Sequence, residues 1–133
     1  AVFASNTSMF TIADLAAATN RKDRFIGMHW FSPANIMRLA EVIYTADTKE
    51  EVIKVTEEIS KRLGKTPVRV KDVPGDLGHI ANRIFYHGVG AEARKVVEEG
   101  VATAQDVDTA MKLGFNWPAG PFELGAGARA GWG

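Results

Sequence analysis

The sequence predicts an α/β layer followed by a segment that contains only helices. In the first half, short apolar runs alternate with stretches of helical periodicity. The composition then shifts at residues 72–78, where two glycines and a proline mark a boundary. Beyond this boundary we find only helical patterns. Strands that alternate with helices favour a sheet covered by helices, and so the fold class is α/β.

Four strands are predicted in the first half, at residues 1–4, 24–31, 37–44 and 67–72. A helix is predicted after Thr11, which forms a capping-box pattern with Asp14. A second helix is predicted after Thr48, which stands in the same relation to Glu51. Its apolar residues repeat at helical spacing up to a stop at Gly64, and they are Val52, Val55, Ile59 and Leu63.

The sequence beyond residue 78 predicts three helices. Residues 79–99 form a long helical pattern that ends at Gly100, with Gly88 and Gly90 inside it. Each internal glycine costs about 1 kcal/mol relative to alanine, which indicates close packing of another backbone or a local break. Thr103 opens the next helix with a third capping-box pattern, and Pro121 is well placed as the first residue of the last helix.

A histidine and a glutamate stand inside two of the apolar strands. Because strand side chains alternate between faces, His29 and Glu41 point where apolar neighbours point. A buried charge without a partner costs several kcal/mol, so each group needs one. The turn at residues 32–33 allows the two strands to approach each other and the two groups to meet. Such a pair suits a general base with an orienting acid, and the alternative is a satisfied histidine of the core.

The composition gives no support for nucleic acid or a membrane as partner. Sixteen basic and sixteen acidic residues cancel within 133 residues, and no apolar run approaches the ~20 residues that span a bilayer. There is no cysteine, and we expect no metal site. Without a visible signal peptide, a cytoplasmic compartment is expected. Both ends look cut, because the chain begins inside a strand and ends in a glycine-rich tail, which suggests a piece of a longer protein.

Six motifs in order resemble the L-3-hydroxyacyl-CoA dehydrogenase family over residues 3–124. They are S-N-T-S, G-M-H-W-F-S-P, L-A-E-V-I, D-V-P-G with N-R, D-V-D-T-A-M-K-L-G and G-P-F-E-L. The resemblance implies that residues 1–73 are the C-terminal part of a Rossmann-type NAD-binding domain. It also implies that residues 74–133 begin an all-α domain for substrate binding and dimerisation.

The resemblance assigns catalytic roles to four residues. His29 would be the general base that takes the proton from the substrate 3-hydroxyl, and Glu41 would be its acidic partner. Ser8 would contact the substrate hydroxyl and the cofactor, and Asn82 would help to hold the substrate oxygen. The implied reaction is the NAD-dependent oxidation of a 3-hydroxyacyl-CoA to a 3-ketoacyl-CoA, in fatty-acid β-oxidation or, in reverse, in butyrate-type metabolism.

The resemblance also implies NAD as cofactor, with Asn6, Ser8 and Ser32 on its side of the site. Ser32 stands where many members of the family carry asparagine. The phosphate-binding G-x-G-x-x-G loop of the family is absent from the 133 residues. The isolated chain is therefore expected to bind NAD poorly and to be inactive, and the full-length protein is expected to act on acyl-CoA as a homodimer formed through its helical domain.

Two other functions fit the same motifs. The chain could be a non-catalytic scaffold or assembly module, or part of a related sugar-acid dehydrogenase of the lambda-crystallin type. The other histidines, His79 and His87, are expected to be ordinary helix residues.

Overall fold

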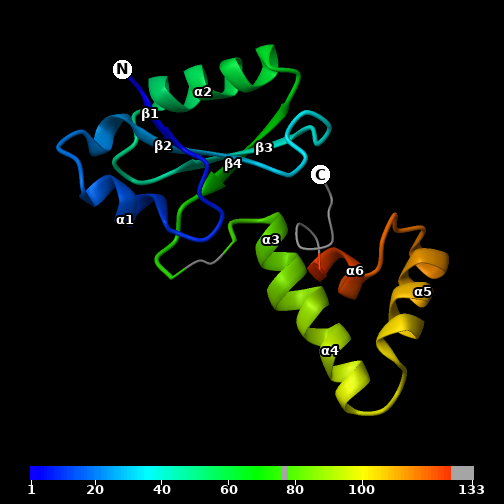
Figure 1. Cartoon of the computed structure of the whole chain (residues 1–133). Coiled ribbons are helices and arrows are strands. Elements are labelled where there is room, and N and C mark those ends of the chain that lie inside the picture. The colour runs from blue at the N-terminus through cyan, green and yellow to red at the C-terminus, as the bar shows by residue number, and fades with distance from the viewer. Residues whose placement is uncertain (76–77, 127–133) are drawn as a thin grey trace. The chain divides into compact units, whose positions relative to one another are not determined.

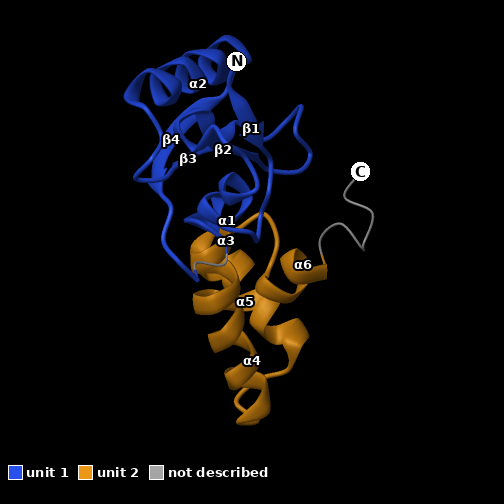
Figure 2. Cartoon of the chain, turned by 90° about the vertical axis from the view of Figure 1, so that its left-hand side faces the viewer, with its two compact units in different colours: residues 1–81 blue, residues 82–133 orange. Residues whose placement is uncertain are grey.

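The computed structural model of the chain describes residues 1–75 and 78–126. The chain divides into two compact units, Ala1–Ala81 and Asn82–Gly133 (Figures 1 and 2). The division lies a few residues after the compositional boundary at residues 72–78. Asp76, Leu77 and the end of the glycine-rich tail lie outside the described residues.

The first unit is built on a sheet of four strands among the described residues. In space their order follows the sequence: β1 (Phe3–Ser5), β2 (Phe25–Trp30), β3 (Leu39–Tyr44) and β4 (Thr66–Lys71). The pairs β1–β2 and β3–β4 are parallel, whereas β2 and β3 are antiparallel. The four predicted strands are confirmed, with ends that differ by a few residues.

Helices cover both faces of this sheet (Figure 1). The 13-residue helix α2 (Glu50–Arg62) lies on one face, where its Val52 and Ile53 pack with Ile26 and Val42. The short helix α1 (Ile12–Ala17) lies on the other, where Ile12 packs with Ile43 and Val70. A 3₁₀ turn, η1 (Lys22–Arg24), leads into β2. Both faces of β2 and β3 are therefore buried, as their apolar sequences require.

The predicted cap of α1 is confirmed, and the predicted cap of α2 is wrong. The Thr11 hydroxyl accepts a hydrogen bond from the backbone N–H of Asp14. The N-terminal cap of α2 is Lys49, which makes no side-chain capping bond. Thr48 instead donates to the carbonyl of Phe25 at 3.0 Å and accepts from the N–H of Thr45. A tertiary contact with the start of β2 thus takes the hydroxyl that the local pattern assigned to the helix.

The residues that α2 buries differ from the apolar repeat that the sequence analysis assigned to its buried face. Val55, Ile59 and Leu63 are 42%, 44% and 54% exposed, whereas Thr56 and Ser60 are buried. The two hydroxyls donate to the backbone carbonyls four residues earlier, at 2.7 and 2.8 Å. Because each hydroxyl is satisfied within its own helix, small polar side chains can face the sheet without a desolvation penalty.

Gly27 in β2 leaves room for the packing of α1 against the sheet. A Cβ atom built at this position would lie 2.7 Å from Cδ1 of Ile43 and 2.9 Å from Cδ1 of Ile12. We expect Gly27→Ala to lower the free energy of unfolding by about 1–3 kcal/mol, as in other overpacked cores. Urea unfolding of the chain measures this, with Gly114→Ala as control because an added Cβ there meets no atom within 4 Å. Equal unfolding midpoints for the two variants would contradict the packing role.

The second unit contains only helices among its described residues. They are the end of α3 (Ala81–Arg83), a π-helical turn η2 (Ile84–Val89), α4 (Gly90–Glu98), α5 (Ala104–Phe115) and α6 (Pro121–Ala126). The predicted cap at Thr103 is confirmed, because its hydroxyl accepts from the N–H of Asp106. Asp108 is buried and accepts hydrogen bonds from the N–H groups of Phe122 and Glu123, which joins α5 to the start of α6.

The long predicted helix at residues 79–99 changes its geometry within its length. A π-helical turn ends at Val89, and the regular helix resumes at Gly90. The two glycines therefore mark a local π-helical distortion rather than a break in the helix. The predicted start is wrong, because His79 has a left-handed backbone with φ of 58° and helix α3 begins only at Ala81.

Candidate active site

His29 and Glu41 face each other across the antiparallel pair β2–β3. The register places the two residues directly opposite, and both lie on the α1 face of the sheet with Gly27 and Ile43. Nδ1 of His29 lies 2.8 Å from Oε2 of Glu41. Their side chains are 3% and 1% exposed. The predicted contact between imidazole and carboxylate forms, and it is shielded from water.

Two backbone groups hold the second oxygen of the Glu41 carboxylate. Oε1 accepts hydrogen bonds from the N–H of Ala81 at 2.9 Å and from that of Ile80 at 3.2 Å. Burial is the largest influence on the pKa of Glu41 and raises it. The hydrogen bonds from His29, Ala81 and Ile80, together with the electrostatic attraction of His29, outweigh burial and lower the pKa of Glu41 below its usual value. Glu41 is therefore a buried carboxylate that stays ionised at neutral pH.

An ionised Glu41 determines the tautomer of His29. A carboxylate only accepts hydrogen bonds, so Nδ1 of His29 carries the proton that is shared with Oε2. In the neutral ring Nε2 then carries a lone pair, and it can accept a proton from a bound molecule. The carboxylate also stabilises the imidazolium ion that results. This arrangement is that of a general base with an orienting acid.

The loop after β1 carries two of the other predicted site residues, Asn6 and Ser8. The side-chain oxygen of Asn6 accepts a hydrogen bond from the N–H of Trp30 at 2.8 Å, which ties the loop to the last residue of β2. The loop therefore lies at the carboxyl ends of two parallel strands, where open α/β sheets bind their ligands. Ser8 is half-buried in this loop, two residues beyond Asn6.

Ser32 is exposed in the connection between β2 and β3, two residues beyond Trp30. The Lys65 ammonium group holds this connection, because it donates to the carbonyls of Ala34 and Met37 and lies over the Trp30 ring, 5.1 Å from its centroid. Asn82 is the first residue of the second unit and is half-buried in α3.

Sequence reasoning missed the contribution of residues 79–81. His79 is 4% exposed, and its ring centroid lies 5.4 Å from that of His29. Its Nε2 lies 3.1 Å from the backbone carbonyl of Thr7. The backbone N–H groups of the next two residues hold Glu41. Gly78, the last residue of the turn-forming cluster at residues 72–78, was a signal that the turn reaches His79 and that the helix starts later.

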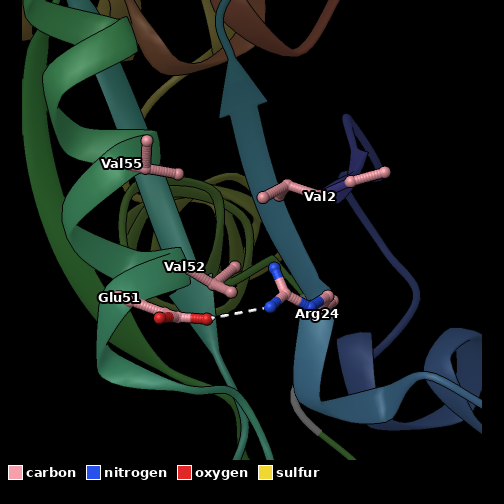
Figure 3. A pocket seen from close by; sticks show the side chains of 6 residues that line it. Val2, Arg24, Glu51, Val52 and Val55 are labelled. Atoms are coloured by element: carbon pink, nitrogen blue, oxygen red, sulfur yellow. Dashed lines mark hydrogen bonds and ion pairs between the residues drawn. The ribbon is translucent and has the colours of Figure 1, made fainter.

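A hollow in the first unit is lined by residues other than His29 and Glu41, which together form the dyad. Val2, Val52 and Val55 line it, with the ion pair of Arg24 and Glu51 at 3.0 Å (Figure 3). Val52 belongs to the α2 face of the sheet, so this hollow is on the side opposite the dyad. Within residues 1–75 and 78–126, no cluster of His, Asp and Glu side chains could hold a metal ion. No helix in that part of the chain is long and apolar enough to cross a membrane.

The sequence matches two family models along most of its length. Residues 1–73 match the model described as 3-hydroxyacyl-CoA dehydrogenase, NAD binding domain. Residues 78–131 match that of 3-hydroxyacyl-CoA dehydrogenase, C-terminal domain. The chain is 47% identical over 123 residues to the human mitochondrial hydroxyacyl-coenzyme A dehydrogenase, covering 92% of this chain and 38% of that protein. It is 42% identical to a probable 3-hydroxybutyryl-CoA dehydrogenase of Bacillus subtilis, covering 92% and 42%.

The fold has a close counterpart among solved structures. The (S)-3-hydroxybutyryl-CoA dehydrogenase of Ralstonia eutropha matches it with a TM-score of 0.84 and 45% identity, over 92% of this chain and 42% of that one. The chain thus spans about two fifths of the length of these relatives. An α/β unit that matches the NAD-binding model is followed by a helical unit that matches the C-terminal model. The chain belongs to the 3-hydroxyacyl-CoA dehydrogenase family.

Proposed function

We propose that the protein containing this chain is an NAD-dependent 3-hydroxyacyl-CoA dehydrogenase, and that His29 is its general base. The observation that carries the proposal is the buried contact of 2.8 Å between Nδ1 of His29 and Oε2 of Glu41. It leaves Nε2 of a neutral histidine as the proton acceptor. The names of the relatives, which are hydroxyacyl-CoA and 3-hydroxybutyryl-CoA dehydrogenases, support the substrate class.

The residues of this chain fit one end of the cofactor. Asn6 and Ser8 follow β1 and Ser32 follows β2, so neutral polar side chains stand at the strand ends where a dinucleotide binds. The sequence contains no G-x-G-x-x-G loop for the pyrophosphate. NAD⁺, when bound, supplies the acceptor for the hydride that leaves C3 of the substrate.

Each of the chain's own residues has a defined task in this reaction. As the hydride leaves C3, the 3-hydroxyl becomes acidic, and Nε2 of His29 takes its proton. Glu41 keeps the ring oriented and stabilises the imidazolium ion that forms. Donor groups of Ser8 and Asn82 stabilise the negative charge that develops on the substrate oxygen. In the reverse direction the protonated His29 returns its proton to the oxygen of the 3-ketoacyl thioester.

The test is an assay of the full-length protein with acetoacetyl-CoA and NADH, followed by the absorbance of NADH. We expect saturable oxidation of NADH, and no reaction when a free sugar acid with NAD⁺ replaces the thioester pair. Turnover of the sugar acid alone would favour the lambda-crystallin alternative. Absence of any turnover in a folded full-length protein would favour the scaffold, although the comparisons favour neither alternative.

The proposal also covers the metabolic role, the oligomeric state and the compartment of the full-length protein. We place the reaction in β-oxidation or, in reverse, in butyrate-type metabolism, and we propose that the full-length protein forms a homodimer through its helical domain. A cytoplasmic compartment is proposed on the sequence alone. Light scattering of the full-length protein tests the dimer, and microscopy of a tagged copy tests the compartment.

A further inference from the structure

His79 joins the dyad to the loop that carries Ser8. Its ring is buried and tilted at 60° to that of His29, with centroids 5.4 Å apart. Nε2 of His79 lies 3.1 Å from the carbonyl oxygen of Thr7. A carbonyl only accepts hydrogen bonds, so Nε2 carries a proton and donates it. The two residues that follow His79 hold the carboxylate of Glu41.

The carbonyl that His79 contacts belongs to the peptide group between Thr7 and Ser8. A peptide group is planar, so a hydrogen bond to this oxygen orients the amide of Ser8 as well. Other bonds within the loop act on both sides of Ser8, because the Thr7 hydroxyl also accepts hydrogen bonds from the N–H groups of Met9 and Phe10. Thr7 donates its N–H to the Ser5 hydroxyl at 3.3 Å, and Asn6 accepts from Trp30. The bond from His79 differs from these, because it ties the peptide group between Thr7 and Ser8 to the segment next to Glu41.

His79 adopts an unfavourable backbone conformation, as expected of a residue whose side chain is held by a tertiary contact. Its φ of 58° is left-handed, a conformation that costs most residues about 1–3 kcal/mol. Gly78 before it is also left-handed, with φ of 107°. The turn directs the imidazole inward while the next two N–H groups face Glu41.

We propose that His79 is a positioning residue: its Nε2–H holds the Thr7 carbonyl and thereby places the Ser8 hydroxyl beside the proton acceptor of His29. This inference rests on the proposed function, since it assumes that Ser8 contacts the substrate oxygen. His79 itself does not touch the substrate. A donor displaced by about 1 Å from the reacting oxygen can cost up to 10²-fold in rate.

The experiment compares three substitutions in the full-length protein. His79→Phe keeps an aromatic ring beside His29 and removes the donor, and we expect kcat to fall about 10-fold with little change in KM. His79→Gln retains an N–H donor at similar reach, and we expect it to restore kcat to within about 3-fold of the wild type. His87→Phe is the matched control, because His87 is an exposed histidine of η2, and its kcat should not change.

A double-mutant cycle with Ser8→Ala separates positioning from a general loss of stability. If His79 acts through Ser8, His79→Phe should lower kcat less than about 2-fold in the Ser8→Ala background. An equal fall in both backgrounds would overturn the proposal, as would an unchanged kcat for His79→Phe. Urea unfolding of each variant shows whether it folds. If His79→Phe does not fold, the tautomer of His79 in the wild-type protein remains the test.

A readout that is independent of activity keeps this inference distinct from the proposed function. In ¹⁵N NMR spectra of the wild-type protein at neutral pH, we expect the His79 ring as the Nε2–H tautomer. We also expect the amide resonance of Ser8 to shift in His79→Phe and to stay in place in His87→Phe. The Nδ1–H tautomer at His79 would refute the positioning role even if the dehydrogenase assay succeeds. A Ser8 amide resonance that does not shift in His79→Phe would refute it as well. If that assay fails but the NMR results hold, the loop contact stands and the catalytic assignment falls.

Discussion

Replacement of His29 by glutamine in the full-length protein is expected to lower kcat for a 3-hydroxyacyl-CoA by ~10²-fold or more. Glutamine preserves size and polarity but cannot accept a proton at neutral pH. The KM for the thioester should change little, because His29 interacts with the substrate proton mainly in the transition state, when the proton is transferred. Steady-state kinetics with acetoacetyl-CoA and NADH measure the effect.

The control for this substitution is His87→Gln, at an exposed position outside the dyad. Its kcat should equal that of the wild type. Urea unfolding of His29→Gln shows whether the protein remains folded, so that a low rate reflects lost chemistry. A folded His29→Gln variant with wild-type turnover would remove His29 from the mechanism.

Substitution of Glu41 by alanine is expected to lower the free energy of unfolding by about 3–5 kcal/mol, the usual effect of removing one partner of a buried pair. The substitution leaves Nδ1–H of His29 and the N–H groups of Ile80 and Ala81 without their acceptor. Each unsatisfied buried donor costs about 1–3 kcal/mol. Urea unfolding measures the loss, which is a large part of a typical total of about 5–15 kcal/mol.

The matched control is Glu58→Ala, which removes an exposed ion pair with Arg62 four residues later. We expect a loss below about 1 kcal/mol there, because water and salt screen such pairs. Similar losses for the two alanine variants would contradict the buried network around Glu41.

The pH dependence of stability provides a second readout for the same carboxylate. Its hydrogen bonds lower the pKa of Glu41 in the folded chain. The stabilisation is therefore fully present above the unfolded value of about 4.3, and it is lost as the pH falls through the lower folded pKa. Glu41→Gln should remove this part of the acid sensitivity. Its amide would donate to Nδ1 of His29 and select the other tautomer, so kcat should also fall.

The local signals in the sequence determined most of the elements of this protein. Apolar runs of β-branched and aromatic residues specified the strands, and the caps at Thr11 and Thr103 formed as predicted. These features depend on residues within a few positions of each other, and local chain geometry satisfies them without help. The contact of His29 with Glu41 was also predictable, because two polar groups on apolar strand faces need a partner.

Tertiary structure decided the features that depend on distant residues. The Thr48 hydroxyl bonds to β2 rather than capping α2, and the buried face of α2 carries Thr56 and Ser60. The position of His79 against Thr7, 72 residues away in sequence, followed from no local pattern. The sequence by itself determined the strands, the motifs and the need for a partner at His29, since these are properties of neighbouring residues. Only the packed sheet decided the register that pairs His29 with Glu41 and the partners of each buried hydroxyl, because burial decides which hydrogen bonds must be made within the protein.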